Sequence, residues 1–233
     1  MNSINAVLFD LDGTLLDTAN DLGTALNHLL QAHQLPTISF EHIRPAAGSG
    51  CRGLLKLGMN IGPDDQRYPV LSEELLALYQ RHLTDTTCFF PGIENTLDFL
   101  DKNGIPWGVV TNKPAKYTEA LIAHLQLEKR AGCVISGDSL PYSKPHPEPI
   151  LHACRLLKQD PKHCLYVGDS AVDIQACKAA GSPSLAALYG YIPVGENPMM
   201  WGADGYVDHA NQIVSHLVTK QKTLSTSSSA GGR

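Results

Sequence analysis

The sequence lacks the features that mark several large classes of protein. None of its apolar runs approaches the roughly 20 residues that a membrane-spanning helix needs. The N-terminus has no basic segment followed by an apolar stretch, so we expect no secretory signal. Lysine and arginine total 18 against 23 acidic residues, which is unlike the basic surface of a nucleic-acid-binding protein. We therefore expect a cytoplasmic protein that binds neither a membrane nor nucleic acid.

Cysteine and histidine patterns typical of zinc sites are absent too. The 6 cysteines include no Cys-x-x-Cys pair, and the 10 histidines show no ligand spacing. The cysteines lie among apolar residues, which is typical of small buried side chains in a reducing compartment. Neither residue type predicts a metal site here.

What the sequence does contain is an alternation of apolar runs and amphipathic stretches. We predict strands at 6–9, 107–110, 133–135, 164–167 and 184–188, and helices at 93–103, 115–127, 147–158 and 171–180. Strands that alternate with helices predict an α/β fold, a doubly wound (Rossmann-like) parallel sheet with both faces covered.

A long helical stretch interrupts this alternation directly after the first strand. Its apolar residues recur at helical spacing, with breaks at 48–53 and at Gly62-Pro63. We interpret it as an inserted all-helical cap domain over 16–87, with the α/β core formed by 1–15 and 88–222. The remaining tail, 223–233, is rich in Ser, Thr and Gly and is expected to be disordered.

Polar residues follow the predicted strands, at the end of the sheet where α/β proteins bind their ligands. A cluster of carboxylates there repels itself unless a cation binds. Because all the implied ligands are oxygens, Mg²⁺ is favoured over zinc. The polar residues of this edge are Asp10, Asp12, Thr111, Asn112, Lys144, Asp169 and Asp173.

Four short sequences in this set resemble the motifs of the haloacid dehalogenase-like superfamily. They are DLDGT, VVTN, SKP and GDSAVD, and they match in order and spacing. The resemblance implies a Mg²⁺-dependent phosphatase that works through an aspartyl-phosphate intermediate. It also implies that Asp10 is the nucleophile and a metal ligand, and that Lys144 neutralises the nucleophile and the phosphate.

The same resemblance implies roles for the other polar residues. Asp12 is implied to be the general acid and base, with its backbone carbonyl on the metal. Because dehalogenases of this superfamily lack an acid at this position, Asp12 favours phosphate chemistry. Thr111 and Asn112 are implied to hold the phosphoryl group. Asp169 is implied to bind the metal directly, and Asp173 to support it directly or through water.

The substrate is expected to be a small phosphorylated metabolite. The cap resembles that of the phosphoglycolate phosphatase group, and residues 107–114, 189–192 and 197–204 resemble bacterial N-acetylmuramic acid 6-phosphate phosphatases. The resemblances imply 2-phosphoglycolate or N-acetylmuramic acid 6-phosphate. Arg52, in a predicted cap loop, is a candidate contact to the leaving group. Lys113 is interpreted as a surface charge, and 189–204 as either a loop at the rim or a substrate contact.

Two other functions agree with the same residues. A phosphosugar mutase shares the cap type and both aspartates, and a non-catalytic phosphometabolite-binding protein shares the fold. Release of inorganic phosphate distinguishes a phosphatase from both. We expect a monomer or a homodimer.

Overall fold

The core of the protein is a parallel β-sheet whose central strand precedes the first motif. The computed structural model describes residues 3–217, and within that range six strands hydrogen-bond in the order β5-β4-β1-β6-β7-β8. Every neighbouring pair in this sheet is parallel. The strands are β1 (Ala6–Phe9), β4 (Trp107–Val110), β5 (Cys133–Ile135), β6 (Cys164–Gly168), β7 (Ser184–Ala187) and β8 (Gly205–Val207).

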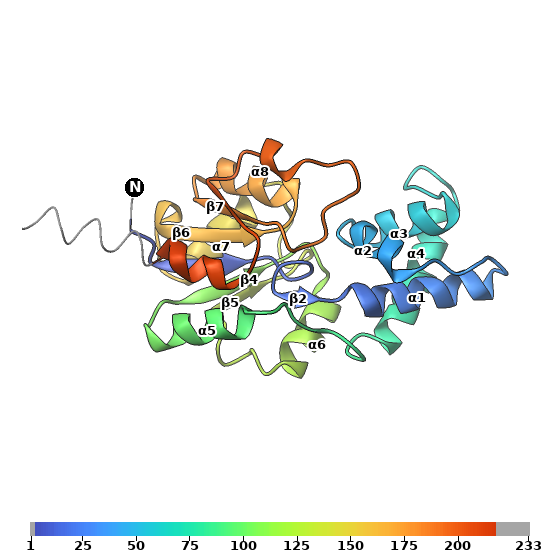
Figure 1. Ribbon diagram of the computed structural model, residues 1–233, viewed down its shortest axis with the longest axis horizontal. Helices are drawn as coiled ribbons and strands as arrows, with labels where there is room; N and C mark the ends of the chain where they lie inside the picture. Colours follow the sequence, from blue (N-terminus) through green and yellow to red (C-terminus); the bar gives the residue numbers. More distant parts are fainter. Residues whose placement is uncertain (1–2, 218–233) are drawn as a thin grey trace, which may run out of the picture.

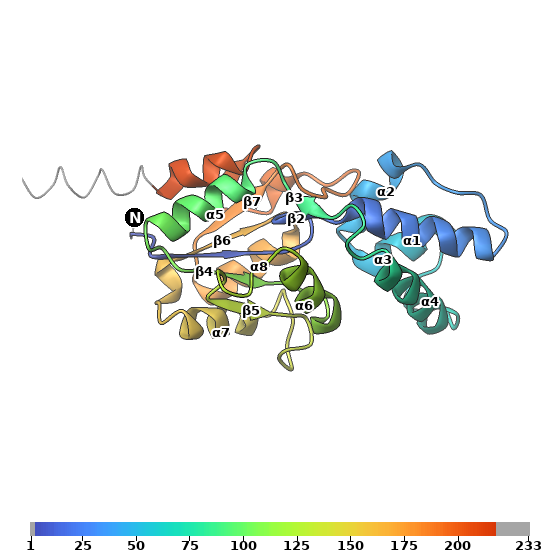
Figure 2. The same cartoon turned by 90° about the horizontal axis from the view of Figure 1, so that it is seen from below.

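Helices cover both faces of this sheet. Val7 and Phe9 of β1 belong to one apolar cluster and Ala6 and Leu8 to another, because successive side chains of a strand point to opposite faces. Figure 2 shows α5 and α7 on opposite sides of the sheet. The structure therefore confirms the predicted doubly wound α/β class. The core helices are α5 (Ile93–Lys102), α6 (Ala115–His124), α7 (Glu148–Leu156) and α8 (Ala171–Ala180), and residues 211–217 are also helical.

The predicted helical cap lies beyond one end of the sheet (Figure 1). Its first and last helices pack along each other through apolar side chains that include the fully buried Leu26 and Leu75. Burial of one such leucine contributes about 1.5–3 kcal/mol. The cap helices are α1 (Ala19–Ala32), α2 (Phe40–Ala47), α3 (Gly50–Met59) and α4 (Tyr68–Arg81).

Two short strands connect the cap to the core. The strands β2 (Leu16–Asp17) and β3 (Cys88–Phe89) pair antiparallel, with Leu16 opposite Phe89. The chain therefore enters and leaves the cap side by side, and we refer to this short connecting ribbon, with the adjoining Thr18, as the hinge.

The prediction of a loop over 48–53 is wrong from Gly50 onward, because α3 begins at that residue. The glycines that suggested a loop serve close packing instead. A Cβ atom on Gly53 would lie 2.3 Å from the carbonyl oxygen of Ala46 in α2. One on Gly48 would lie 2.9 Å from the carbonyl oxygen of Tyr191 in the core. Absence of a side chain thus allows α2 to approach both α3 and the core.

Three further elements complete the described part of the chain. Strand β8 extends the sheet beyond the predicted strands, and two short 3₁₀ helices are η1 (Pro161–His163) and η2 (Pro198–Met200). The tail predicted to be disordered, 223–233, lies outside the described residues. Across residues 3–217, the helices are too short or too polar to cross a membrane.

Candidate active site

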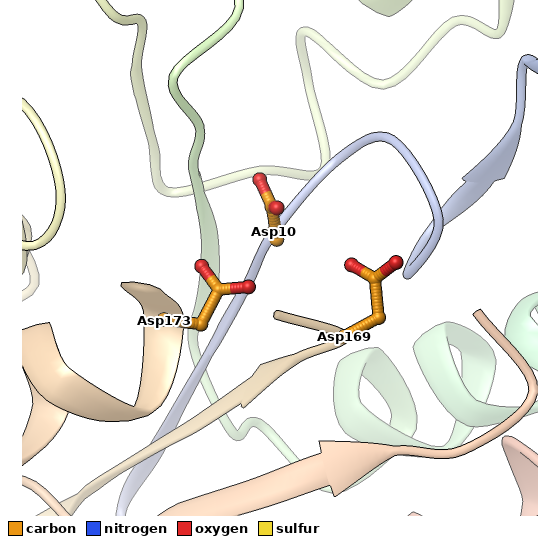
Figure 3. A group of neighbouring side chains, drawn as sticks. All are labelled: Asp10, Asp169 and Asp173. Atoms are coloured by element: carbon orange, nitrogen blue, oxygen red, sulfur yellow. The ribbon is translucent and has the colours of Figure 1, made fainter. Parts of the chain in front are cut away.

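The sequence motifs meet at the carboxyl edge of the sheet. Asp10 follows β1, Thr111 follows β4 and Asp169 follows β6, and these three strands are neighbours. Figure 3 shows the side chains of Asp10, Asp169 and Asp173 grouped together, with their carboxylates pointing to the same side. Asp173 comes from the first turn of α8, where its carboxylate also accepts a hydrogen bond from the backbone N–H of Ser170 at 3.1 Å. The strand order alone therefore assembles three of the four motifs.

Lys144 is the cation at the centre of this group. Its side chain is 1% exposed, and its Nζ lies 2.9 Å from Oδ1 of Asp10 and 2.7 Å from Oδ1 of Asp173. It also donates to the hydroxyl of Tyr166 at 2.8 Å and to the carbonyl of Val110 at 3.0 Å. Burial lowers the pKa of Lys144, but the two carboxylates outweigh it and raise the pKa above its ordinary value. Lys144 is therefore a fixed positive charge.

The carboxylates carry more negative charge than Lys144 can balance. Oxygens of Asp10, Asp169 and Asp173 lie within 4.8 Å of one another. Burial, with the repulsion of Asp173, raises the pKa of Asp10 to about 6 despite Lys144. Burial and the neighbouring carboxylates also raise the pKa of Asp169. Three converging carboxylate oxygens are a donor set that suits a hard divalent cation such as Mg²⁺.

Asp169 is held in place by the first motif and by the loop after β7. It accepts a hydrogen bond from the hydroxyl of Thr14 at 3.0 Å and one from the backbone N–H of Tyr191 at 2.8 Å. Gly13 has φ +79°, and a Cβ atom there would lie 2.0 Å from Oδ2 of Asp169. The glycine of the first motif is therefore required both by the turn and by the space that Asp169 occupies.

Asp12 points to a different set of partners. Its carboxylate accepts hydrogen bonds from the hydroxyl of Thr18 at 2.6 Å and from Nζ of Lys113 at 2.9 and 3.1 Å. The metal-ligand group above contains the carboxylates of Asp10, Asp169 and Asp173, whereas that of Asp12 is engaged by these donors. The two aspartates of the first motif thus face separate electrostatic surroundings.

Thr111 and Asn112 lie at the end of β4, beside this group. Thr111 is 4% exposed, and its hydroxyl accepts a hydrogen bond from the backbone N–H of Lys113 at 3.2 Å. The side chain of Asn112 bonds the backbone of Lys144 twice, at 2.9 Å in each direction. Asn112 therefore fixes the loop that delivers Lys144, a role that its position in the motif did not reveal.

Arg52 lies apart from the network formed by these residues. It is exposed in the first turn of α3, and among residues 3–217 it has no hydrogen-bond or ion-pair partner. Its guanidinium group is thus held by neither the cap nor the core.

The interpretation of Lys113 as a surface charge is wrong. Its side chain is 7% exposed, and besides Asp12 it donates to the hydroxyl of Tyr79 at 2.9 Å. Burial lowers the pKa of Lys113, but Asp12 outweighs burial and raises it. Tyr79, its partner in the cap, is 34 residues away in sequence. In the sequence, only the adjacency of Lys113 to the VVTN motif indicated that this lysine lies at the site.

Tyr191 contacts both the carboxylate cluster and the hinge. It lies in the loop 189–204, whose role the sequence left open. Its ring is buried, and its hydroxyl accepts hydrogen bonds from the backbone N–H groups of Thr18 at 2.6 Å and Ala19 at 2.9 Å. It also donates to Oδ1 of Asp17 at 2.9 Å. Since its own N–H bonds Asp169, one residue connects the carboxylate cluster with the start of the cap.

Known proteins are similar to this chain in sequence and in fold. A family model described as "Haloacid dehalogenase-like hydrolase" matches residues 7–187. An N-acetylmuramic acid 6-phosphate phosphatase from Pseudomonas aeruginosa is 37% identical over 214 residues, covering 92% of this chain and 95% of that protein. A phosphoglycolate phosphatase from Xanthomonas campestris pv. campestris is 38% identical over 208 residues, covering 89% of this chain and 94% of that protein.

A solved structure gives the same picture at the level of the fold. The crystal structure of a "predicted phosphoglycolate phosphatase" from Haemophilus somnus 129PT has a TM-score of 0.81 at 27% sequence identity. The match covers 93% of this chain and 99% of that one, so the core and the cap are both shared.

Proposed function

Because this chain belongs to the haloacid dehalogenase-like hydrolase family, we propose that it is a Mg²⁺-dependent phosphatase for a small phosphorylated metabolite. The observation that carries the proposal is the placement of Asp10. Its carboxylate lies 2.9 Å from the buried Lys144 and beside two further buried carboxylates, at the edge of the sheet. A nucleophile next to a fixed cation and a metal-ligand group is what transfer of a phosphoryl group requires.

Mg²⁺ would be held by Asp10, Asp169 and Asp173, the residues whose oxygens already converge. The backbone carbonyl of Asp12 is proposed as a further ligand. When bound, the ion supplies positive charge that stabilises the phosphoryl oxygens as negative charge spreads over them. Lys144 contributes a second positive charge from the protein itself, and Thr111 and Asn112 are proposed to hold the phosphoryl oxygens.

The first half of the reaction breaks the ester. A carboxylate oxygen of Asp10 forms a bond to phosphorus while the bond between phosphorus and the leaving oxygen breaks. Asp12 gives a proton to that oxygen, so that an alcohol departs and an aspartyl phosphate remains. Proton donation of this kind contributes about 10²–10⁴-fold to the rate.

The second half of the reaction restores the enzyme. Water gives a proton to the carboxylate of Asp12 and forms a bond to phosphorus, while the bond between phosphorus and Asp10 breaks. The product is inorganic phosphate, and Asp12 is again ready to act as an acid. The hydrogen bonds that Asp12 accepts from Thr18 and Lys113 support this proposal, because they hold its carboxylate at the edge of the sheet.

The cap is proposed to select the substrate by closing over it and excluding water. Relatives named for N-acetylmuramic acid 6-phosphate and for phosphoglycolate match this chain almost equally, at 37% and 38% identity. We therefore propose these two compounds as the substrates to test first, with Arg52 as a contact to the leaving group.

Release of inorganic phosphate from both compounds tests the proposal. We expect turnover by the wild type that EDTA abolishes and Mg²⁺ restores. Asp10→Asn should lower turnover by about 10³-fold or more, because an amide cannot act as the nucleophile. Asp64→Asn, an exposed aspartate of the cap, is the matched control and should retain wild-type turnover. Turnover by Asp10→Asn equal to that of the wild type would refute the proposed nucleophile.

A further inference from the structure

Lys113 is a buried lysine with partners in both parts of the molecule. Its Nζ bonds both oxygens of Asp12, at 2.9 and 3.1 Å, and the hydroxyl of Tyr79 at 2.9 Å. Asp12 and Lys113 follow strands β1 and β4 of the core, whereas Tyr79 belongs to α4 of the cap. Lys113 is therefore a point of contact between the cap and a residue proposed to transfer protons.

The side chain of Tyr79 is buried and packs against the core. It is 1% exposed, and its ring centroid lies 5.7 Å from that of Tyr117 in α6 and 4.6 Å from Nζ of Lys113. Burial raises the pKa of Tyr79 to about 12, so the hydroxyl stays neutral and accepts the hydrogen bond from Lys113. Movement of α4 away from the core would remove this partner from Lys113.

The other group that holds Asp12 also depends on the cap. Thr18 donates its hydroxyl to Asp12 at 2.6 Å and is the residue from which α1, the first cap helix, begins. All the side-chain donors to Asp12 within residues 3–217 are thus Thr18, at the start of α1, and Lys113, a core lysine that contacts α4. Each donor is adjacent to the cap.

On the basis of the function proposed above, we infer that Lys113 is a positioning residue that orients the carboxylate of Asp12, and that the position of Lys113 depends on the cap through Tyr79. Lys113 keeps the carboxylate oriented toward the water that attacks the aspartyl phosphate. With the cap in contact, Tyr79 and Asp12 together fix the ammonium group. Proton transfer by Asp12 is then efficient only when the cap is in place over the substrate.

A purely structural ion pair accounts less well for this arrangement. The desolvation that a buried ion pair costs is commonly as large as its attraction, so such a pair is weak evidence for a stabilising role. A lysine kept only for stability would also have no reason to face a carboxylate at the reacting edge of the sheet. We therefore expect Lys113→Met to show a defect in one chemical step, in addition to any loss of stability from leaving Asp12 without its cation.

Pre-steady-state kinetics with p-nitrophenyl phosphate isolates that step. The p-nitrophenolate ion leaves without a proton, so formation of the aspartyl phosphate needs no acid from Asp12. Hydrolysis of the aspartyl phosphate still requires Asp12 to accept a proton from water. In Lys113→Met, which keeps the length of the side chain without its charge, we expect a burst of p-nitrophenolate at the wild-type rate. We expect the steady-state rate after the burst to fall about 10- to 100-fold.

Tyr79→Phe is the milder second variant, because it removes only the hydroxyl. It should show the same pattern, with a steady-state rate lowered about 3- to 10-fold and an unchanged burst rate. Lys116→Met, an exposed lysine of α6, and Tyr117→Phe, the ring neighbour of Tyr79, are the matched controls. Both should keep the wild-type burst and steady-state rates.

The outcomes separate this inference from the function on which it rests. A wild type without turnover, or an Asp10→Asn variant with full turnover, would overturn the proposed function and the inference together. If the wild type turns over but Lys113→Met and Tyr79→Phe keep its steady-state rate, the inference alone fails. It also fails if the burst and steady-state rates fall in proportion in both variants, because that is the result of general damage to the site.

Discussion

The two buried lysines of the site differ in what surrounds them. Lys144 is 1% exposed, and its partners Asp10, Asp173 and Tyr166 all belong to the core. Lys113 is 7% exposed and is shared between Asp12 and the cap residue Tyr79. The residues proposed to handle the phosphoryl group are therefore held by the core alone. The lysine beside Asp12, the residue proposed to transfer protons, also has a partner in the cap.

We propose that this difference limits wasteful chemistry. The charge of Lys144, proposed to bind phosphate, has partners in the core and does not rely on the position of the cap. Asp12, the residue proposed to transfer protons, is held by Thr18 at the start of the cap and by Lys113, which also contacts the cap. Reaction with water is then favoured only when the substrate site is covered, which is the role generally assigned to closing lids.

The largest effect should come from the core lysine. Lys144→Met leaves the buried carboxylates of Asp10 and Asp173 without their cation, which costs about 3–5 kcal/mol of unfolding free energy. Loss of the same charge from the phosphoryl site should lower kcat/KM by about 10³-fold. Urea unfolding in metal-free buffer and phosphate release measure the two effects, and Lys116→Met serves as the control. Unchanged values of both would show that Lys144 is not the central cation.

Binding of Mg²⁺ should distinguish the two halves without any measurement of activity. At 100 times its dissociation constant, the ion should raise the unfolding free energy by about 2.7 kcal/mol, because it binds only the folded chain. Asp169→Asn should abolish this gain, since Asp169 belongs to the group of converging carboxylates. Asp12→Asn should keep it. If Asp12→Asn loses the stabilisation by Mg²⁺ and Asp169→Asn keeps it, or if both variants lose it equally, the proposed separation of the metal site from Asp12 would be contradicted.

The two tyrosines that contact the lysines offer a closer comparison. Tyr166 accepts a hydrogen bond from Lys144 and shares its own proton between Val110 and Asp173, so Tyr166→Phe removes one partner from each of three buried polar groups. We expect a loss of about 1–3 kcal/mol in unfolding free energy. Tyr79→Phe, which removes one partner of Lys113, should cost about 1 kcal/mol. Urea unfolding at matched ionic strength measures both losses in unfolding free energy. A larger loss in Tyr79→Phe than in Tyr166→Phe would contradict the expected difference between the two lysine sites.

The smallest effect is expected at Arg52. It is exposed on α3, so a contact to the substrate would form in water and be worth about 0–1 kcal/mol. Arg52→Ala should therefore raise KM no more than about 5-fold and leave kcat unchanged. Lys56→Ala, an exposed lysine of the same helix, is the control. A large decrease in kcat would place Arg52 in the chemistry instead.

The sequence was sufficient to predict the core sheet and the motif residues at its edge. Strand β1 is a short apolar run that ends at a carboxylate, and both features are local and easily recognised. Parallel pairing then forces the residues after β1, β4 and β6 to one edge, so their proximity follows from fold class alone. Convergence of Asp10, Asp169 and Asp173 needed no knowledge of side-chain packing.

What the sequence did not reveal depends on contacts between distant parts of the chain. Lys113 looks like any lysine next to a turn until Tyr79, 34 residues earlier, is placed against it. Tyr191 gains its role from Thr18, which lies 173 residues away in sequence. Strand β8 has only three residues, two of them partly exposed, and gave no clear periodic signal. Each of these features requires the position of the cap or of the last strand relative to the core.

The most direct test of the proposed chemistry is to trap the covalent intermediate. The wild type would be acid-quenched during turnover and digested, and its peptides analysed by mass spectrometry. We expect a phosphoryl group on the peptide that contains Asp10, retained in the control Asp64→Asn and absent in Asp10→Asn. Two results would contradict Asp10 as the nucleophile. One is a wild type that releases phosphate and carries the phosphoryl group on another residue. The other is a wild type that carries no phosphoryl group although Lys113→Met shows a burst.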